Sequence, residues 1–263
     1  MNAFENNVKT LVSSDDAIQN YIGEQFLEWL LETITSEVRS WPELKQIRES
    51  SARPEKIKKF ILQRYLAAES FLGGKDGEPG FLGFAIANLS ESPDPLAENA
   101  LGILEQKREE EFAGSKGAAA PKQNTHQDLW IKLLKALDLS SEDIARAEAK
   151  EATRTYISEL SDIYSTSEWQ TVMGAFLAHE RAIPDEYAAI SQMIKKNTSV
   201  GPEAMEVFTW HAGVDIKYVI NTSHMLEKIV VDPESKQLVW EGVVKQLSIR
   251  KDFYASLARY LEG

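Results

Sequence analysis

Hydrophobic residues recur at intervals of three and four along most of this chain, whereas the alternation of apolar and polar residues typical of strands is rare. The first such stretch runs from about Asp15 to Val38. Its apolar positions fall on one face of a helix: Ile18, Tyr21, Ile22, Phe26, Trp29, Leu30 and Ile34. This pattern predicts an amphipathic helix, and its repetition along the chain predicts an all-α fold.

Proline, glycine and polar clusters divide the rest of the chain into further predicted helices. Pro42 marks the end of the first helix or the start of a short second one, and Pro54 opens a helix that stops at a glycine pair. Further helices are predicted over 81–89, about 95–112, 126–137, 140–164, 168–181, 184–196, 202–231 and 238–261. Thr125 and Asp128 resemble a capping box. Small and polar residues at about 113–125 predict a flexible surface loop.

About eight amphipathic helices joined by short turns must bury their apolar faces against one another. An up-and-down helical bundle satisfies that requirement. The length of 263 residues fits one large domain, so we expect residues 1–263 to form a single bundle. Bundles build their active sites from polar side chains that point inward from several helices, which directs attention to histidines and carboxylates.

Composition removes several classes of function. The formal net charge of -12, without a local cluster of basic residues, argues against nucleic-acid or anionic-membrane partners. The chain has no cysteine, so disulfides, thiolate metal sites, a cysteine nucleophile and iron–sulfur clusters are excluded. The first residues lack a secretory signal pattern, and no uncharged apolar run approaches the ~20 residues that span a bilayer. We therefore expect a soluble cytoplasmic protein whose metal ligands, if any, are His, Asp and Glu.

The histidines narrow the search for a site, because the chain has four: His126, His179, His211 and His224. His211 and Asp215 stand four residues apart in an apolar, helical stretch, so both side chains can reach one ion. The same spacing also suits a hydrogen bond at the helix surface. His224 is about 180° around the helix from Asp215 and is excluded as a partner on the same ion.

Three other groups are candidates, each with a simpler interpretation. Glu180 ends the small, apolar stretch V-M-G-A-F-L-A-H-E, where a carboxylate needs a metal or a salt-bridge partner. Glu109, Glu110 and Glu111 span most of a helix circumference, so one of them should face inward unless the run is simply solvated. His126 stands at a predicted helix start, where it could also be an exposed residue beside the cap.

The order of these motifs is more specific than any one of them. A Glu-rich helix end, a histidine in N-T-H-Q-D-L-W, then G-A-F-L-A-H-E-R-A-I-P and H-A-G-V-D resemble the haem-oxygenase-like di-iron oxidase superfamily. The sequence looks most like its CADD-like branch and more distantly like the TenA and PqqC proteins. The resemblance covers roughly residues 55 to 230. It implies a seven-to-eight-helix bundle of the haem-oxygenase-like fold.

The resemblance also implies a ligand set. By this resemblance the metal ligands would be Glu110, His126, Glu180, His211 and Asp215. Glu111 is the alternative to Glu110, and Glu180 would be the bridging carboxylate. The superfamily places a second histidine three residues after the aspartate, where this chain has Tyr218. A neutral phenol is a poor ligand, so one metal position is weakened or Tyr218 becomes chemically modified. Glu180 and Tyr218 are therefore the candidate catalytic residues.

The function implied is a metal-dependent oxidoreductase, a non-haem iron oxidase or oxygenase acting with dioxygen on a small organic substrate. The cofactor would be two iron ions, or one if Tyr218 disables the second position, and manganese is an alternative. A non-catalytic binding protein and a metal-independent enzyme of the same fold remain open alternatives, and Tyr218 is the main argument for the former. Such bundles are commonly homodimers, so we expect one here.

Overall fold

The computed structural model describes residues 13–73, 79–113 and 125–262, apart from the side chains of residues 112–113 and 211–215. Its α-helices are α1 (Ser14–Asn20), α2 (Gly23–Ser40), α3 (Pro42–Glu49), α4 (Pro54–Leu72), α5 (Phe81–Ser90), α6 (Ala97–Ala113), α7 (His126–Ala136), α8 (Ser141–Ala145), α9 (Glu151–Thr166), α10 (Trp169–Asn197), α11 (Glu206–Glu227) and α12 (Pro233–Ala258). Two 3-10 helices, η1 (Pro202–Met205) and η2 (Arg259–Leu261), precede α11 and follow α12. Among these residues, extended pairing is confined to an isolated bridge between Gly73 and Pro79, so the all-α prediction is confirmed.

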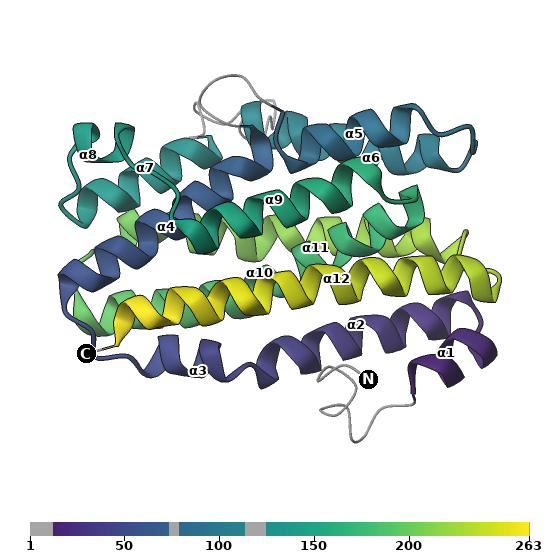
Figure 1. Cartoon of the computed structure of the whole chain (residues 1–263), viewed down its shortest axis with the longest axis horizontal. Helices are drawn as coiled ribbons and strands as arrows, with labels where there is room; N and C mark the ends of the chain where they lie inside the picture. Colours follow the sequence, from purple (N-terminus) through teal and green to yellow (C-terminus); the bar gives the residue numbers. More distant parts are fainter. Residues whose placement is uncertain (1–12, 74–78, 114–124, 263) are drawn as a thin grey trace.

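The long helices lie along the long axis of the molecule and pack side by side (Figure 1). Helices α10 and α12 run through the middle, with α2 and α3 on one side and α5, α6, α7 and α9 on the other. The buried apolar residues of these helices form one hydrophobic cluster. This arrangement is the helical bundle that the sequence predicts.

Two glycines allow the central helices α10 and α12 to touch backbone to backbone. A Cβ atom on Gly174 would lie 2.1 Å from the carbonyl oxygen of Val239, and one on Gly242 would lie 2.0 Å from that of Thr171. Real Cβ atoms do not approach so closely, so glycine is required at both positions. The close contact holds α10 in the centre of the bundle, where Glu180 is fully buried.

Several predicted helix starts are confirmed. Helices α3 and α4 begin at Pro42 and Pro54, each in the first turn, where a missing N–H costs nothing. Before α7, the Thr125 hydroxyl accepts from the Asp128 N–H at 3.2 Å, and the Asp128 carboxylate accepts from the Thr125 N–H at 2.9 Å. This is the predicted capping box. The loop expected before it lies, at residues 114–124, outside the described residues.

The single long helix expected from Asp15 to Val38 is wrong. The chain leaves the helical conformation at Tyr21 and Ile22, between α1 and α2. The buried Lys236 ammonium of α12 donates to the carbonyl oxygens of Ile18, at 3.2 Å, and Tyr21, at 2.6 Å. This contact with a distant helix satisfies carbonyls at the end of α1, and the local apolar stripe could not reveal it.

The continuous helix expected over 140–164 is also divided, into α8 and α9. The amide of Gln63, on α4, donates to the carbonyl oxygen of Glu148 at 3.0 Å. The same side chain accepts from the backbone N–H of Lys150 at 2.8 Å and from the Thr153 hydroxyl at 2.7 Å. A buried side chain of another helix thus satisfies the connecting backbone, which therefore needs no helical hydrogen bonds.

The two helices expected over 168–181 and 184–196 are in fact one, the 29-residue α10. Pro184 lies inside it and cannot donate a hydrogen bond to the carbonyl of Glu180. Proline normally ends or kinks a helix, but α10 packs against both α11 and α12. Tertiary packing therefore overrides the local signal.

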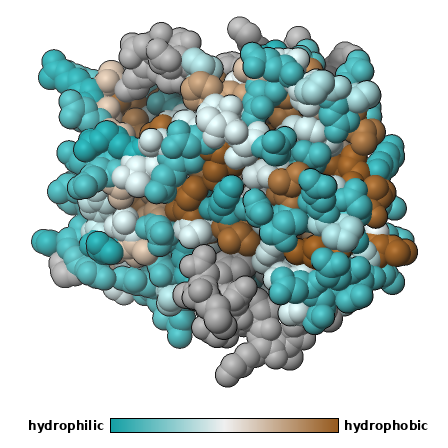
Figure 2. Space-filling view, turned by 45° about the vertical axis from the view of Figure 1, so that its right-hand side comes forward, coloured by the Kyte–Doolittle hydropathy of each residue, from teal (hydrophilic) through white to brown (hydrophobic). Residues whose placement is uncertain are grey.

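The face seen in Figure 2 is mostly hydrophilic, with hydrophobic patches between the polar residues. Exposed large hydrophobic residues include Ile22, Leu96, Ile216, Ile220 and Val231. None of the helices in the described part of the chain is long and apolar enough to cross a membrane.

Candidate functional site

Helix α6 contributes the first two site residues, Lys107 and Glu111. They stand one turn apart on the inner face of the helix and are 1% and 2% exposed. The Lys107 ammonium lies 3.0 Å from Glu111 Oε1. The adjacent Glu110 points instead towards the rim, where its carboxylate accepts from Lys217 at 2.5 Å. Glu111 is therefore the inward carboxylate of the Glu109–Glu111 run.

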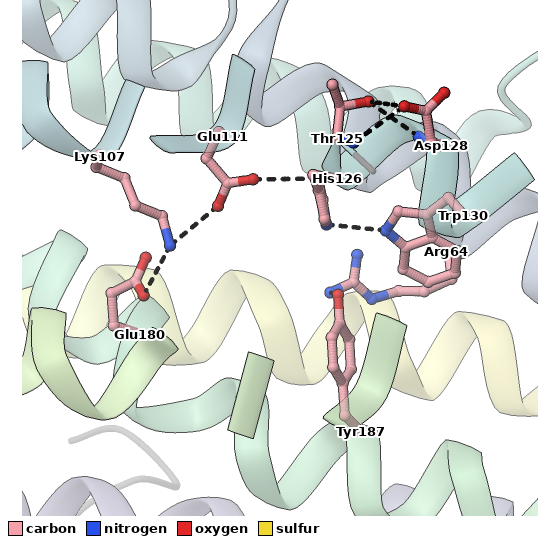
Figure 3. A network of polar contacts seen from close by, with 9 residues as sticks. All are labelled: Arg64, Lys107, Glu111, Thr125, His126, Asp128, Trp130, Glu180 and Tyr187. Atoms are coloured by element: carbon pink, nitrogen blue, oxygen red, sulfur yellow. Dashed lines mark hydrogen bonds and ion pairs between the residues drawn. The ribbon is translucent and has the colours of Figure 1, made fainter. Parts of the chain in front are cut away.

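Lys107 joins two helices across the interior. Its ammonium also lies 3.2 Å from Oε2 of Glu180, on α10, a residue with no exposed surface (Figure 3). Two carboxylates and one ammonium are thus buried together, and the ammonium pairs with both carboxylates. Such pairing offsets part of the cost of burying charge, which is about several kcal/mol for an unpaired ion.

Helix α7 brings a buried imidazole to the same place. Because the Thr125–Asp128 capping box fixes the start of the helix, its first residue, His126, faces inward and is 6% exposed. Its Nδ1 lies 3.5 Å from Glu111 Oε2, and its Nε2 accepts from the Trp130 indole N–H at 3.0 Å (Figure 3). The ring also stacks on Trp210 of α11, at 5.9 Å between centroids. His126 is therefore held on three sides.

Tyr218, at the position where the superfamily has a histidine, covers the opposite side of the ion-paired cluster. The Lys107 ammonium lies over its ring, 4.4 Å from the centroid, which is cation–π distance. Burial, and then the nearby Glu110 carboxylate, raise the pKa of the Tyr218 phenol, so it keeps its proton at neutral pH. Partial burial acts to raise the pKa of Glu110, but the hydrogen bonds and charge of its neighbours, Lys217 foremost, together outweigh it and hold that pKa low.

The structure brings three of the predicted ligands together and leaves two undescribed. Glu111, His126 and Glu180 converge from α6, α7 and α10. His211 and Asp215 lie on α11, as predicted, but their side chains are outside the described residues. Within the described part of the chain, no group of three or more His, Asp and Glu has the spacing of a metal site.

The donor types nevertheless fit a divalent metal. Carboxylate oxygens and an imidazole nitrogen are ligands for Fe(II) or Mn(II), and here they are fully buried. The ammonium of Lys107 already pairs with both carboxylates and offsets part of their charge. Lys107 was not among the residues expected at the site, although its position four residues before Glu111 on a helix is a recognisable ion-pair signal.

A second buried polar network lies beyond Trp130 and was also missed. Arg250 donates to both carboxylate oxygens of Glu186, and its Nη1 lies 2.8 Å from His179 Nδ1. Tyr254 donates to Glu186 at 2.9 Å and accepts from Arg64 at 3.0 Å. His179 is thus in contact with the arginine of this second network.

Comparison with known proteins gives a family match. Residues 64–251 match the family described as iron-containing redox enzymes. A curated relative, the 4-aminobenzoate synthase of Chlamydia pneumoniae, is 25% identical over 137 residues. That alignment covers 52% of this chain and 61% of the relative, so the chain spans less than two thirds of that protein's length.

Solved structures show the same fold at low identity. A CADD-like protein of unknown function from Nostoc punctiforme has a TM-score of 0.65 at 16% identity, covering 97% of both chains. A domain with a haem-oxygenase-like fold from Shewanella denitrificans has a TM-score of 0.64 at 16% identity, covering 90% of both chains. A TenA homologue from Pseudomonas syringae has a TM-score of 0.63 at 12% identity and covers 96% of this chain and 98% of its own. The predicted haem-oxygenase-like fold is therefore confirmed.

Proposed function

The chain belongs to the family of iron-containing redox enzymes, and on that premise we propose that it is a non-haem iron oxidase or oxygenase that uses dioxygen on a small organic substrate. The observation that carries this proposal is the convergence of Glu111, His126 and Glu180, all buried, from three helices. Carboxylates and an imidazole that point inward from several helices are the donor set with which helical bundles bind iron or manganese.

The proposed ligands are Glu111, His126 and Glu180, together with His211 and Asp215 of α11. The α11 segment that carries the last two lies between Trp210, which stacks on His126, and Tyr218, which covers Lys107. The helix therefore passes directly along the cluster, which supports their assignment. Bound iron would supply the redox chemistry with dioxygen, a reaction that protein side chains do not perform by themselves.

The surrounding residues position the ligands and exclude water. Trp130 holds the His126 ring through its indole N–H, and Trp210 packs on the face of that ring. Phe176 packs edge-on against Tyr218 at 6.4 Å on the α10 side. An apolar shell of this kind keeps a reactive centre from bulk water and preserves the orientation of its ligands.

The substrate is proposed only as a class. The Chlamydia relative is named for the formation of 4-aminobenzoate, a small aromatic acid, and a small organic molecule is the class that fits a bundle interior.

The decisive experiment compares the buried Glu180 with Glu110, which pairs with Lys217 at the rim. The apo-protein is loaded anaerobically with Fe(II), bound iron is measured, and oxygen is admitted while the absorbance spectrum is recorded. We expect iron binding and an oxygen-dependent band from the wild type and from Glu110→Gln, and loss of both from Glu180→Gln. Wild-type protein that binds no iron above background would refute the proposal. Substrate turnover that persists in chelator would instead establish the metal-independent alternative.

A further inference from the structure

The buried ammonium of Lys107 occupies a place between the two carboxylates that a metal ion would otherwise bridge. It lies 3.0 Å from Glu111 Oε1 and 3.2 Å from Glu180 Oε2, and it is 1% exposed. A lysine ammonium is a compact cation, and placed between two carboxylates it does electrostatically what a metal ion would do there. Lys107 is therefore a built-in cation of the centre.

The ring of Tyr218 holds this lysine in place. The Lys107 ammonium lies 4.4 Å from the ring centroid, so it is stabilised by the aromatic face as well as by the two carboxylates. An imidazole in the place of Tyr218 would offer a metal ligand, whereas the phenol ring offers a surface for a cation. The lysine and the tyrosine thus form a matched pair that favours an ammonium over a second metal ion.

The His126 side of the cluster is closed by a second contact. Trp130 donates its indole N–H to Nε2 of His126, so a neutral imidazole carries its own hydrogen on Nδ1, which faces Glu111. A metal ion bound through Nδ1 would leave both ring nitrogens acting as acceptors, which a neutral imidazole cannot do. A metal ion held by Glu111 and His126 would therefore require both the Lys107 and the Trp130 contacts to break.

We propose that Lys107 replaces one of the two metal ions, so that this protein binds a single iron ion. This inference rests on the proposed function, because it assumes that the centre binds iron. The second metal ion is absent, on this inference, because Lys107 takes its place and not because Tyr218 stands where the superfamily has a histidine.

The test is the number of iron ions bound per chain, measured by equilibrium dialysis against Fe(II) without oxygen and by elemental analysis. We expect one ion in the wild type and two in Lys107→Met, with the second ion bound at least tenfold more tightly than any second ion in the wild type. The matched control is Lys217→Met, which removes the other ammonium near the Tyr218 ring, 5.5 Å from its centroid, and should still bind one ion.

A second variant separates the two explanations and does not depend on the folding of Lys107→Met. Tyr218→His restores the histidine but leaves Lys107 in place, so we expect it to bind one ion. Two ions in Tyr218→His would overturn the role of Lys107, as would one ion in a folded Lys107→Met. Two ions in the wild type would overturn the inference while leaving the proposed function intact. Absence of iron from the wild type would refute the proposed function itself and the inference with it.

Discussion

Removal of the Lys107 ammonium should destabilise the metal-free protein strongly. In the wild type this cation pairs with both Glu111 and Glu180, neither of which has appreciable contact with water. Replacement by Met keeps most of the side-chain volume but removes the positive charge that lies within 3.2 Å of both carboxylates. Loss of one partner of a buried ion pair costs ~3–5 kcal/mol. We expect a value near the lower end, because one carboxylate can take up a proton instead of remaining charged.

Urea denaturation of the metal-free proteins, followed by circular dichroism, measures this change as a difference in the free energy of unfolding. Lys217→Met is the control, since its ammonium is 46% exposed and pairs with Glu110 at the rim. Exposed ion pairs contribute about 0–1 kcal/mol, so its stability should differ little from that of the wild type. Mn(II) at a hundred times its dissociation constant should restore about 2.7 kcal/mol to Lys107→Met.

A double-mutant cycle identifies the cause. In Lys107→Met/Glu111→Gln one of the two opposed carboxylates is also removed, so the double variant should be more stable than the sum of the single changes predicts by about 1 kcal/mol or more. Additive single changes, or a Lys107→Met protein as stable as the Lys217→Met control, would refute the claim that the ammonium neutralises these carboxylates.

Three further changes test the packing and the helix ends. Gly242→Ala should lower the free energy of unfolding by about 1–3 kcal/mol in thermal or urea melts, because its Cβ would meet a backbone carbonyl of α10. The control Gly102→Ala, in open space on α6, should raise it by about 0.5–1 kcal/mol, and equal effects would contradict the close contact. Glu186→Ala should cost ~3–5 kcal/mol in urea, since it leaves Arg250 buried without its carboxylate, and a cost under about 1 kcal/mol would show that the pair is unimportant. Asp232→Ala should cost about 1 kcal/mol at neutral pH through loss of the α12 cap. A hydrogen bond from the Ser235 backbone holds the pKa of Asp232 below the ordinary aspartate value. The destabilisation by Asp232→Ala should therefore be complete above the ordinary aspartate pKa and disappear as the pH falls through the lowered pKa of Asp232. A destabilisation that does not depend on pH would contradict this assignment.

The sequence by itself determined the features that depend on neighbouring residues. The three- and four-residue spacing of apolar positions is enough to predict helices, and a capping box such as Thr125–Asp128 uses only atoms within one turn. The order of short motifs was likewise enough to indicate the haem-oxygenase-like fold and to name Glu111, His126 and Glu180 among the candidates. These patterns involve residues close together in the sequence, so they can be recognised without the tertiary structure.

Only the tertiary structure decided which helices break, which continue and how the buried charges pair. The break before Gly23 depends on Lys236 from the far end of the chain, and the continuation of α10 through Pro184 depends on the helices packed around it. The same holds for the site. A run of three glutamates has no preferred inward member until helix packing buries Glu111, and Lys107 meets Glu180 across 73 positions of sequence. Contacts between residues far apart in the chain arise from helix packing, and the local spacing of apolar residues does not specify them.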